Sequence, residues 1–209
     1  MMALCVLAVV LAGFGGRVAV GMSSFTKAPW YLHVHGISMM AWIGLYVVQN
    51  WLVWRGDVTL HRKLGKLGFV FAPLLVATTV PMFIYMDKTD SFLDPRTGLL
   101  LAPSAMRVLV FAVMVVVAIL IAKRIDWHRR LMLSATAILI LLGWLRIGER
   151  LTENATIFGQ GVLLMIAACM IFDKVNRGKV HPAWYWGLAA HIFLMAITIV
   201  LLAGVSNPP

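Results

Sequence analysis

The sequence is poor in charge, since Asp, Glu, Lys and Arg together make up 12% of its 209 residues. A soluble domain carries roughly 25% charged residues, which cover the surface that faces water. Hydrophobic residues make up 62% of this chain, so too few polar groups remain to form such a surface. The composition therefore excludes a soluble globular protein. It predicts a single transmembrane domain over residues 1–209, with the lipid bilayer as its main partner.

Acidic residues are scarcer still, at eight against 18 Lys and Arg, which gives a net charge of +10. None lies inside an apolar segment apart from Glu149, near the end of one. Proton-coupled transporters usually keep a carboxylate within the membrane, so this absence disfavours that class. The basic residues stand in short breaks between apolar runs, where they face lipid headgroups, and we expect no nucleic-acid partner.

The sequence also lacks a cysteine framework. Its two cysteines, Cys5 and Cys169, lie in apolar segments, and neither belongs to a CxxC pair or stands near clustered histidines. Two such cysteines do not make a set of disulfides. Their context favours small buried hydrophobic side chains over metal ligands.

Seven apolar segments predict an all-α bundle of about seven transmembrane helices. The segments cover approximately residues 2–22, 30–54, 65–86, 105–123, 130–147, 155–172 and 183–204. Each approaches the roughly 20 residues that cross the hydrocarbon core. A spanning segment in lipid must also satisfy its own backbone polar groups, which makes these segments helices. The short break between residues 147 and 155 is the weakest boundary, and we interpret it as a helical hairpin.

The distribution of Lys and Arg predicts the orientation of these helices. Eleven of the 18 fall at breaks on one side of the bundle, namely Arg55, Arg62, Lys63, Lys66, Lys123, Arg124, Arg129, Arg130, Lys174, Arg177 and Lys179. Loops rich in Lys and Arg face the cytoplasm, so this side should be cytoplasmic. With an odd number of spans, the N-terminus lies inside and the C-terminus outside, in the inner (plasma) membrane of the cell.

The chemically suggestive set is made of six histidines, His33, His35, His61, His128, His181 and His191. His61 and His128 stand at equal depth on the predicted cytoplasmic rim, each followed by basic residues. Two helices can present one imidazole each to a haem iron from opposite faces, which makes this pair the candidate metal ligands. The alternative is a pair of interfacial histidines that contact lipid phosphate.

Two further histidines are candidate cofactor-binding residues. His35 shares a helical stripe with Trp42, Tyr46 and Gln49, the most polar stripe of its segment, so it should face the bundle interior. His191 lies well inside the last segment, where an ionisable side chain is costly and needs a partner or a metal. In both cases the alternative is a packed polar side chain without a ligand.

The last break, from Asp173 to Pro182, is predicted to be a structural turn. Gly178 and Pro182 favour a turn before the final segment. Asp173 and Arg177 stand four residues apart, which is the spacing of an ion pair on a helix. We therefore expect His181 to belong to this turn rather than to a binding site.

Several short motifs occur together in a set order. They are His33-x-His35-Gly36, Leu60-His61-Arg62-x-Leu64-Gly65, His128-Arg129-Arg130-x-Met132 and Asp173…Arg177-Gly178-x-Val180-His181-Pro182, with Trp42, Gln49 and Arg146 at intervening positions. In this order and spacing, across about residues 33–185, the chain resembles an uncharacterised family of bacterial multi-pass membrane proteins. The resemblance implies no settled activity. The histidine layout is similar to that of transmembrane b-type cytochromes, which by analogy implies haem b.

These observations give one leading hypothesis and two alternatives. In the first, the protein binds haem b through histidines drawn from His35, His61, His128 and His191, and transfers electrons in the membrane. In the second, it is a carrier or a lipid- or anion-binding protein whose rim histidines and arginines hold an anionic headgroup. In the third, it is an accessory or assembly subunit that has other membrane proteins as partners. No residue is assigned a catalytic role.

Overall fold

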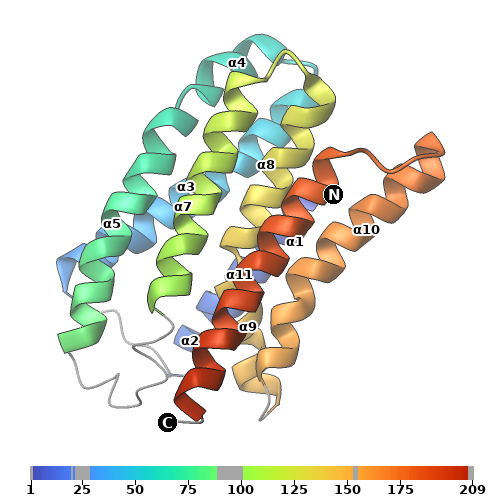
Figure 1. Cartoon of the computed structure of the whole chain (residues 1–209). Helices are drawn as coiled ribbons and strands as arrows, with labels where there is room; N and C mark the ends of the chain where they lie inside the picture. Colours follow the sequence, from blue (N-terminus) through green and yellow to red (C-terminus); the bar gives the residue numbers. More distant parts are fainter. Residues whose placement is uncertain (1, 20, 22–28, 89–100, 153–154, 207–209) are drawn as a thin grey trace.

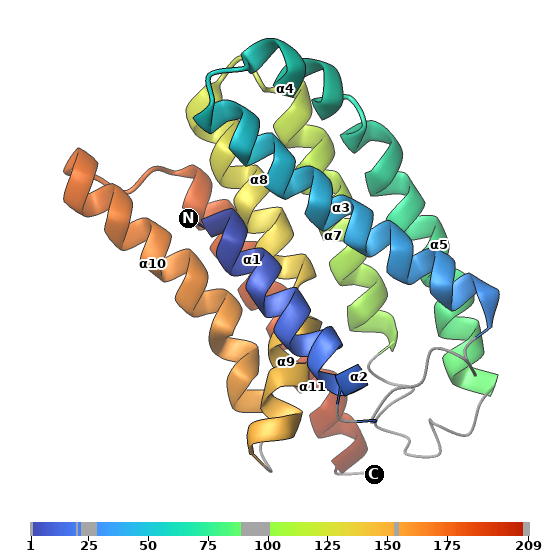
Figure 2. The same cartoon turned by 180° about the vertical axis from the view of Figure 1, so that it is seen from behind.

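The computed structural model of the chain describes residues 2–19, 21, 29–88, 101–152 and 155–206, and every regular element in these ranges is helical. Figure 1 shows the helices gathered in one bundle, and Figure 2 shows the same bundle from behind. The predicted all-α class is therefore confirmed for the part of the chain that is described.

The N-terminal stretch is a short continuous helix that consists of α1 (Met2–Val10), a π-helical turn η1 (Leu11–Gly15) and α2 (Gly16–Ala19). The helices that follow are α3 (Trp30–Trp54), α4 (Val58–Gly65), α5 (Gly68–Lys88) and α7 (Leu101–Leu120). The second half of the chain contains α8 (Ile125–Leu139), α9 (Leu141–Leu151), a 3-10 turn η2 (Ala155–Gln160), α10 (Gly161–Arg177) and α11 (Ala183–Ser206).

Five helices of the described chain are long and apolar enough to cross a membrane, namely Trp30–Trp54, Val58–Pro81, Pro103–Leu120, Ile157–Arg177 and Ala183–Leu201. The pair of α8 and α9 would make a sixth span, with a bend of 41° between the two helices. The expected segment at residues 2–22 corresponds to a shorter apolar helix, Met2–Gly15. The helices thus suggest a multi-pass membrane protein, while the count of seven spans and the orientation of the termini stay predictions.

The long helices share one apolar interior. α11 contacts α7, α8 and α10, α3 contacts α5, and α5 contacts α7. The N-terminal helix lies against α3 and α9 (Figure 2). Buried side chains from these helices meet in the core, and the largest include Trp42, Phe111, Ile138, Ile166 and Leu194.

The bend between α8 and α9 goes with a close approach of α9 to the N-terminal helix. A Cβ atom on Gly13 would lie 2.5 Å from the Gly143 carbonyl oxygen, and one on Gly143 would lie 3.1 Å from Val9 Cγ1. Small residues let helix backbones approach this closely in membrane proteins. Gly13 therefore packs within the chain, against α9.

The turns at one end of the bundle are fixed by local capping. Asp57 accepts a hydrogen bond from the Leu60 backbone N–H at 2.9 Å and so caps α4. Gly178 ends α10 with a φ of 71°, a left-handed conformation that favours glycine. His181 Nδ1 accepts a hydrogen bond from the Ala183 backbone N–H at 3.2 Å, where α11 begins. These caps hold the polar turns next to the ends of the long helices.

Candidate functional site at the basic end

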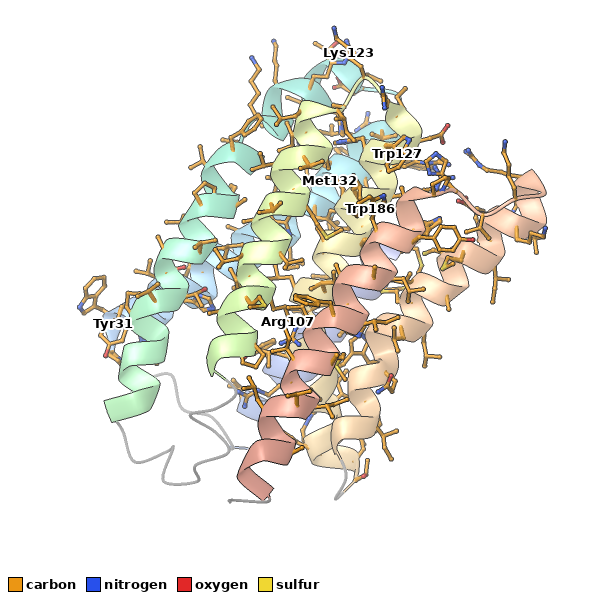
Figure 3. All side chains as sticks on the ribbon, in the orientation of Figure 1. Tyr31, Arg107, Lys123, Trp127, Met132 and Trp186 are labelled. Atoms are coloured by element: carbon orange, nitrogen blue, oxygen red, sulfur yellow. The ribbon has the colours of Figure 1, made fainter. Side chains whose placement is uncertain are left out.

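The basic end of the bundle is the end that carries α4, the α7–α8 turn and the α10–α11 turn (Figure 1). Lys123 marks it in Figure 3. Two of the candidate histidines converge here, because His61 comes from α4 and His128 from the first turn of α8. Their ring centroids lie 6.2 Å apart, and their ring planes stand at 86°. The sequence placed His61 and His128 on the same rim of the bundle, and the structure shows that they are also close in space.

The hydrogen bond of His128 determines which of its ring nitrogens is free. Nδ1 lies 2.8 Å from the backbone carbonyl oxygen of Ala118, and a carbonyl can only accept. Nδ1 therefore carries the hydrogen and donates it, which leaves the lone pair of Nε2 available in the neutral ring. Histidines that ligate metals are commonly oriented in this way, by a partner on the opposite nitrogen.

The His61 ring interacts with the Gln49 backbone, yet buried side-chain atoms of both residues lack hydrogen-bond partners in the described part of the chain. Nδ1 of His61 and both polar side-chain atoms of Gln49 make no hydrogen bond there. The Gln49 side chain points toward α4, because a Cβ atom on Gly65 would lie 3.7 Å from its Nε2. Buried polar groups are nearly always paired, and an unpaired one costs about 1–3 kcal/mol. Polar groups from α3 and α4 thus remain available for a ligand beside His128.

His35 lies apart from this pair, between α3 and α5. Its Nδ1 is 3.2 Å from the Thr78 hydroxyl oxygen. The Thr78 hydroxyl donates to the Leu74 carbonyl at 2.9 Å, so His35 is the donor toward Thr78. From His35 to Gln49 the helix advances 14 residues, which is roughly 21 Å. His35 therefore joins two helices far from His61.

His191 lies in the interior of α11, with an exposed fraction of 0%. Neither ring nitrogen has a hydrogen-bond partner among the residues described. Arg107, labelled in Figure 3 well below the basic end, lies on α7, which packs against α11. Of the four candidate histidines, the structure brings together His61 and His128 and places His35 and His191 elsewhere.

A buried ion pair at the basic end was not expected from the sequence. Arg130 donates to both carboxylate oxygens of Asp173, from Nε and Nη2, at 2.7 Å each. The indole Nε1 of Trp184 donates to the same carboxylate at 2.7 Å. The exposed fractions of the Arg130 and Asp173 side chains are only 1% and 5%. Arg130, Asp173 and Trp184 thus link α8, α10 and α11.

Asp126 and Arg177 extend the ion pair toward the surface. Arg130 donates from Nη1 to a carboxylate oxygen of Asp126 at 2.9 Å, and Arg177 donates to the same oxygen at 2.8 Å. The ion pair expected between Asp173 and Arg177 is present only as a longer contact of 3.9 Å. Arg130, rather than Arg177, is therefore the main partner of Asp173.

His181 lies next to this network in a structural role. Its ring stands edge-on to that of Trp127, with centroids 5.3 Å apart, and its Nδ1 accepts the Ala183 N–H. Burial, and then the charge of Arg130, lowers the pKa of His181 below its usual value. The neutral ring, which can accept this hydrogen bond, is thereby favoured. His181 thus helps to start α11, as its place in the predicted turn indicated.

The pair of His61 and His128 offers two ligands, whereas a structural zinc ion takes four. Among the described residues, no group of three or more His, Cys, Asp or Glu side chains is placed to hold a metal ion. Haem needs only one or two axial ligands from the protein, so two imidazoles suit haem better than a bare ion. Comparison of the chain with models of known families, with characterised proteins and with solved structures gave no significant match.

Proposed function

We propose that the protein binds haem b at the basic end, where His61 and His128 would hold it, and that it transfers electrons within the membrane. One observation carries this proposal. Two imidazoles from separate helices stand 6.2 Å apart, and one has its Nδ1 fixed on a carbonyl. Two imidazoles this close together, from separate helices, are a donor set that would hold a haem iron.

The surroundings of the pair also suit haem, which carries two carboxylates. An open groove along α4, the helix that carries His61, is lined by Val58, Thr59, Arg62, Lys63 and Lys66. Its cationic side chains would neutralise the carboxylates, and the unpaired amide of Gln49 would add a hydrogen bond. Bound haem supplies one-electron chemistry. The chain would contribute the orientation of His128, which tunes a haem potential.

We further propose that the protein lies in the inner (plasma) membrane and that its basic end faces the cytoplasm. The excess of Lys and Arg at this end supports the orientation. In that orientation the N-terminal helix, whose apolar part is Met2–Gly15, would be the first of seven spans, with the N-terminus inside. His61 and His128 would then place the electron-transfer site at the cytoplasmic face of the membrane.

His61→Ala and His128→Ala are each expected to remove most of the haem absorption. The protein is expressed with ample haem and purified, and its visible spectrum is recorded before and after addition of dithionite. The wild type should show a Soret band and, once reduced, an alpha band. The Soret absorbance per chain of each variant should be about tenfold or more below that of the wild type, because one ligand is missing. His35→Ala, the matched control outside the site, should keep the wild-type spectrum.

A wild-type protein without a Soret band would overturn the haem proposal, as would undiminished haem in both alanine variants. A second candidate function, the binding of an anionic lipid headgroup, is favoured by the cationic groove along α4. It predicts no chromophore. Instead, phospholipid that copurifies with the wild type should decrease in Arg62→Gln and in His61→Ala, as measured by mass spectrometry of extracted lipid. The same protein preparations therefore separate the two functions.

A further inference from the structure

A second group of buried polar side chains lies away from the basic end. Arg107 of α7 has an exposed fraction of 7%, and its Nε makes no hydrogen bond within the described chain. His191 of α11 is fully buried, and both of its ring nitrogens are unpartnered there as well. The two residues lie on helices that pack against each other, α7 and α11. Figure 3 shows Arg107 at mid-height in the bundle, beside α11.

Both side chains lie deep within helices that cross the bundle in opposite directions. Arg107 is about 9 Å from the start of α7, and His191 is about 12 Å from the start of α11, at 1.5 Å for each residue. An arginine at such depth is costly unless another group pairs with it. No described carboxylate compensates the charge of Arg107. The interior thus holds a cation that lacks a counter-charge among the residues described.

Trp42 adds another unused donor to this region. Its ring stands edge-on to Phe111 of α7 with centroids 4.8 Å apart, and Phe111 is one helical turn from Arg107. The indole Nε1 of Trp42 is buried and makes no hydrogen bond with any described residue. Arginine and tryptophan side chains carry only donors, and a neutral histidine always keeps one. The unsatisfied groups contributed by α3, α7 and α11 are therefore mostly N–H groups.

Ser134 of α8 completes the set. Its hydroxyl is buried without a partner in the described residues, and it faces Gly187, one turn before His191 on α11. Each of four packed helices, α3, α7, α8 and α11, thus carries a buried polar group without a partner among the described residues, and one of these groups is a cation. Water could satisfy some of these donors, but it would leave the charge of Arg107 uncompensated. A group that offers only acceptors and carries a negative charge satisfies both requirements.

We propose that a small anion binds between α7 and α11, held by the charge of Arg107 and by an N–H of His191. The anion is either inorganic, such as chloride, or the carboxylate of a small organic acid, since both offer only acceptor atoms. This site lies apart from His61 and His128, so it goes beyond the haem function and does not depend on it.

Thermal unfolding of the purified full-length protein in detergent, followed by tryptophan fluorescence, tests the site. Sodium chloride and sodium acetate are each compared with the sodium salt of a bulky sulfonate at equal ionic strength. Chloride or acetate should raise the Tm saturably, by about 5–10 °C at a concentration one hundred times Kd. Arg107→Gln should abolish this shift. Arg124→Gln, which removes an exposed arginine, should retain it and thereby exclude simple screening.

A shift with chloride alone identifies an inorganic anion, and a shift with acetate alone identifies a carboxylate. An equal shift in the wild type and in Arg107→Gln would overturn the proposal, as would no shift with either salt. If Arg107→Gln does not fold, equilibrium binding of radioactive chloride and acetate to the wild type decides the question. About one bound anion for each chain supports the site, and none for either probe overturns it. These measurements need no haem, so their outcome is separate from that of the haem proposal.

Discussion

Asp173→Asn is expected to lower the free energy of unfolding by about 3–5 kcal/mol, the usual cost of removing one partner of a buried ion pair. The change leaves the Arg130 guanidinium, which is 1% exposed, without the charge that it contacts through two hydrogen bonds. It also weakens the acceptor of the Trp184 indole N–H. Unfolding of the purified protein in mixed micelles, followed by circular dichroism as denaturing detergent is added, measures the effect.

Asp126→Asn is the matched control within the same network. The Asp126 side chain is 51% exposed, and exposed ion pairs contribute about 0–1 kcal/mol. Similar decreases in the free energy of unfolding of both variants would show that the buried pair of Arg130 and Asp173 stabilises the bundle no more than the exposed Asp126 contact does. The double variant Arg130→Met with Asp173→Leu removes both buried charges, and it should be more stable than Asp173→Asn.

Gly13→Ala is expected to lower the free energy of unfolding by about 1–3 kcal/mol, the usual cost of forcing an extra methyl group into a filled space. The new Cβ would stand 2.5 Å from the Gly143 carbonyl oxygen and 2.8 Å from the Gly143 Cα. Both are backbone atoms, which cannot rotate away as the end of a side chain would. The N-terminal helix must therefore move away from α9, and the same micelle assay measures the loss.

Gly15→Ala is the control for this substitution, because it lies two residues further along the same helical stretch. No atom lies within 4 Å of a Cβ placed on Gly15. Alanine favours a helix over glycine by about 1 kcal/mol, so the variant should be as stable as the wild type or slightly more stable. A destabilisation as large as that of Gly13→Ala would show that the close approach to α9 is not the reason for the glycine.

The apolar segments predicted most helices, because a membrane span requires a long run without charge. α3 covers Trp30–Trp54, the same residues as the expected segment. The bend between α8 and α9 could not be predicted in this way, since no proline marks the sequence Ile138-Leu139-Ile140-Leu141-Leu142. The bend accompanies the contact of Gly143 with the N-terminal helix, and hydropathy carries no information about contacts between distant segments.

Depth and helical face were the parts of the candidate site that the sequence could supply. His61 and His128 both belong to the first turn of a helix at the basic end, which placed them on one rim. The stripe predicted to face inward does so at Trp42 and Tyr46, both of which are buried. His35, at the far end of that stripe, meets Thr78 of α5, a partner that periodicity on one helix cannot reveal.

The sequence did not predict the ion pair between Arg130 and Asp173, because these residues are 43 positions apart. Spacing within one helix could suggest only the partner four residues away, Arg177. The sequence of α10 nevertheless indicated that Asp173 needs a partner. Asp173 continues a buried face that contains Ile166 and Cys169, and a carboxylate on such a face needs a partner with opposite charge.

The separation of 43 residues between Arg130 and Asp173 also separates them in time. A ribosome that adds about 5–20 residues each second delivers Asp173 roughly 2–9 s after Arg130. During this interval the arginine has Asp126 as a partner but no carboxylate from α10, so it stays at the membrane surface. Synthesis of α10 and the start of α11 then supplies the carboxylate and the Trp184 indole that allow its burial. The hydrogen bonds that link α8, α10 and α11 can therefore form during translation only after Trp184 has been added to the chain.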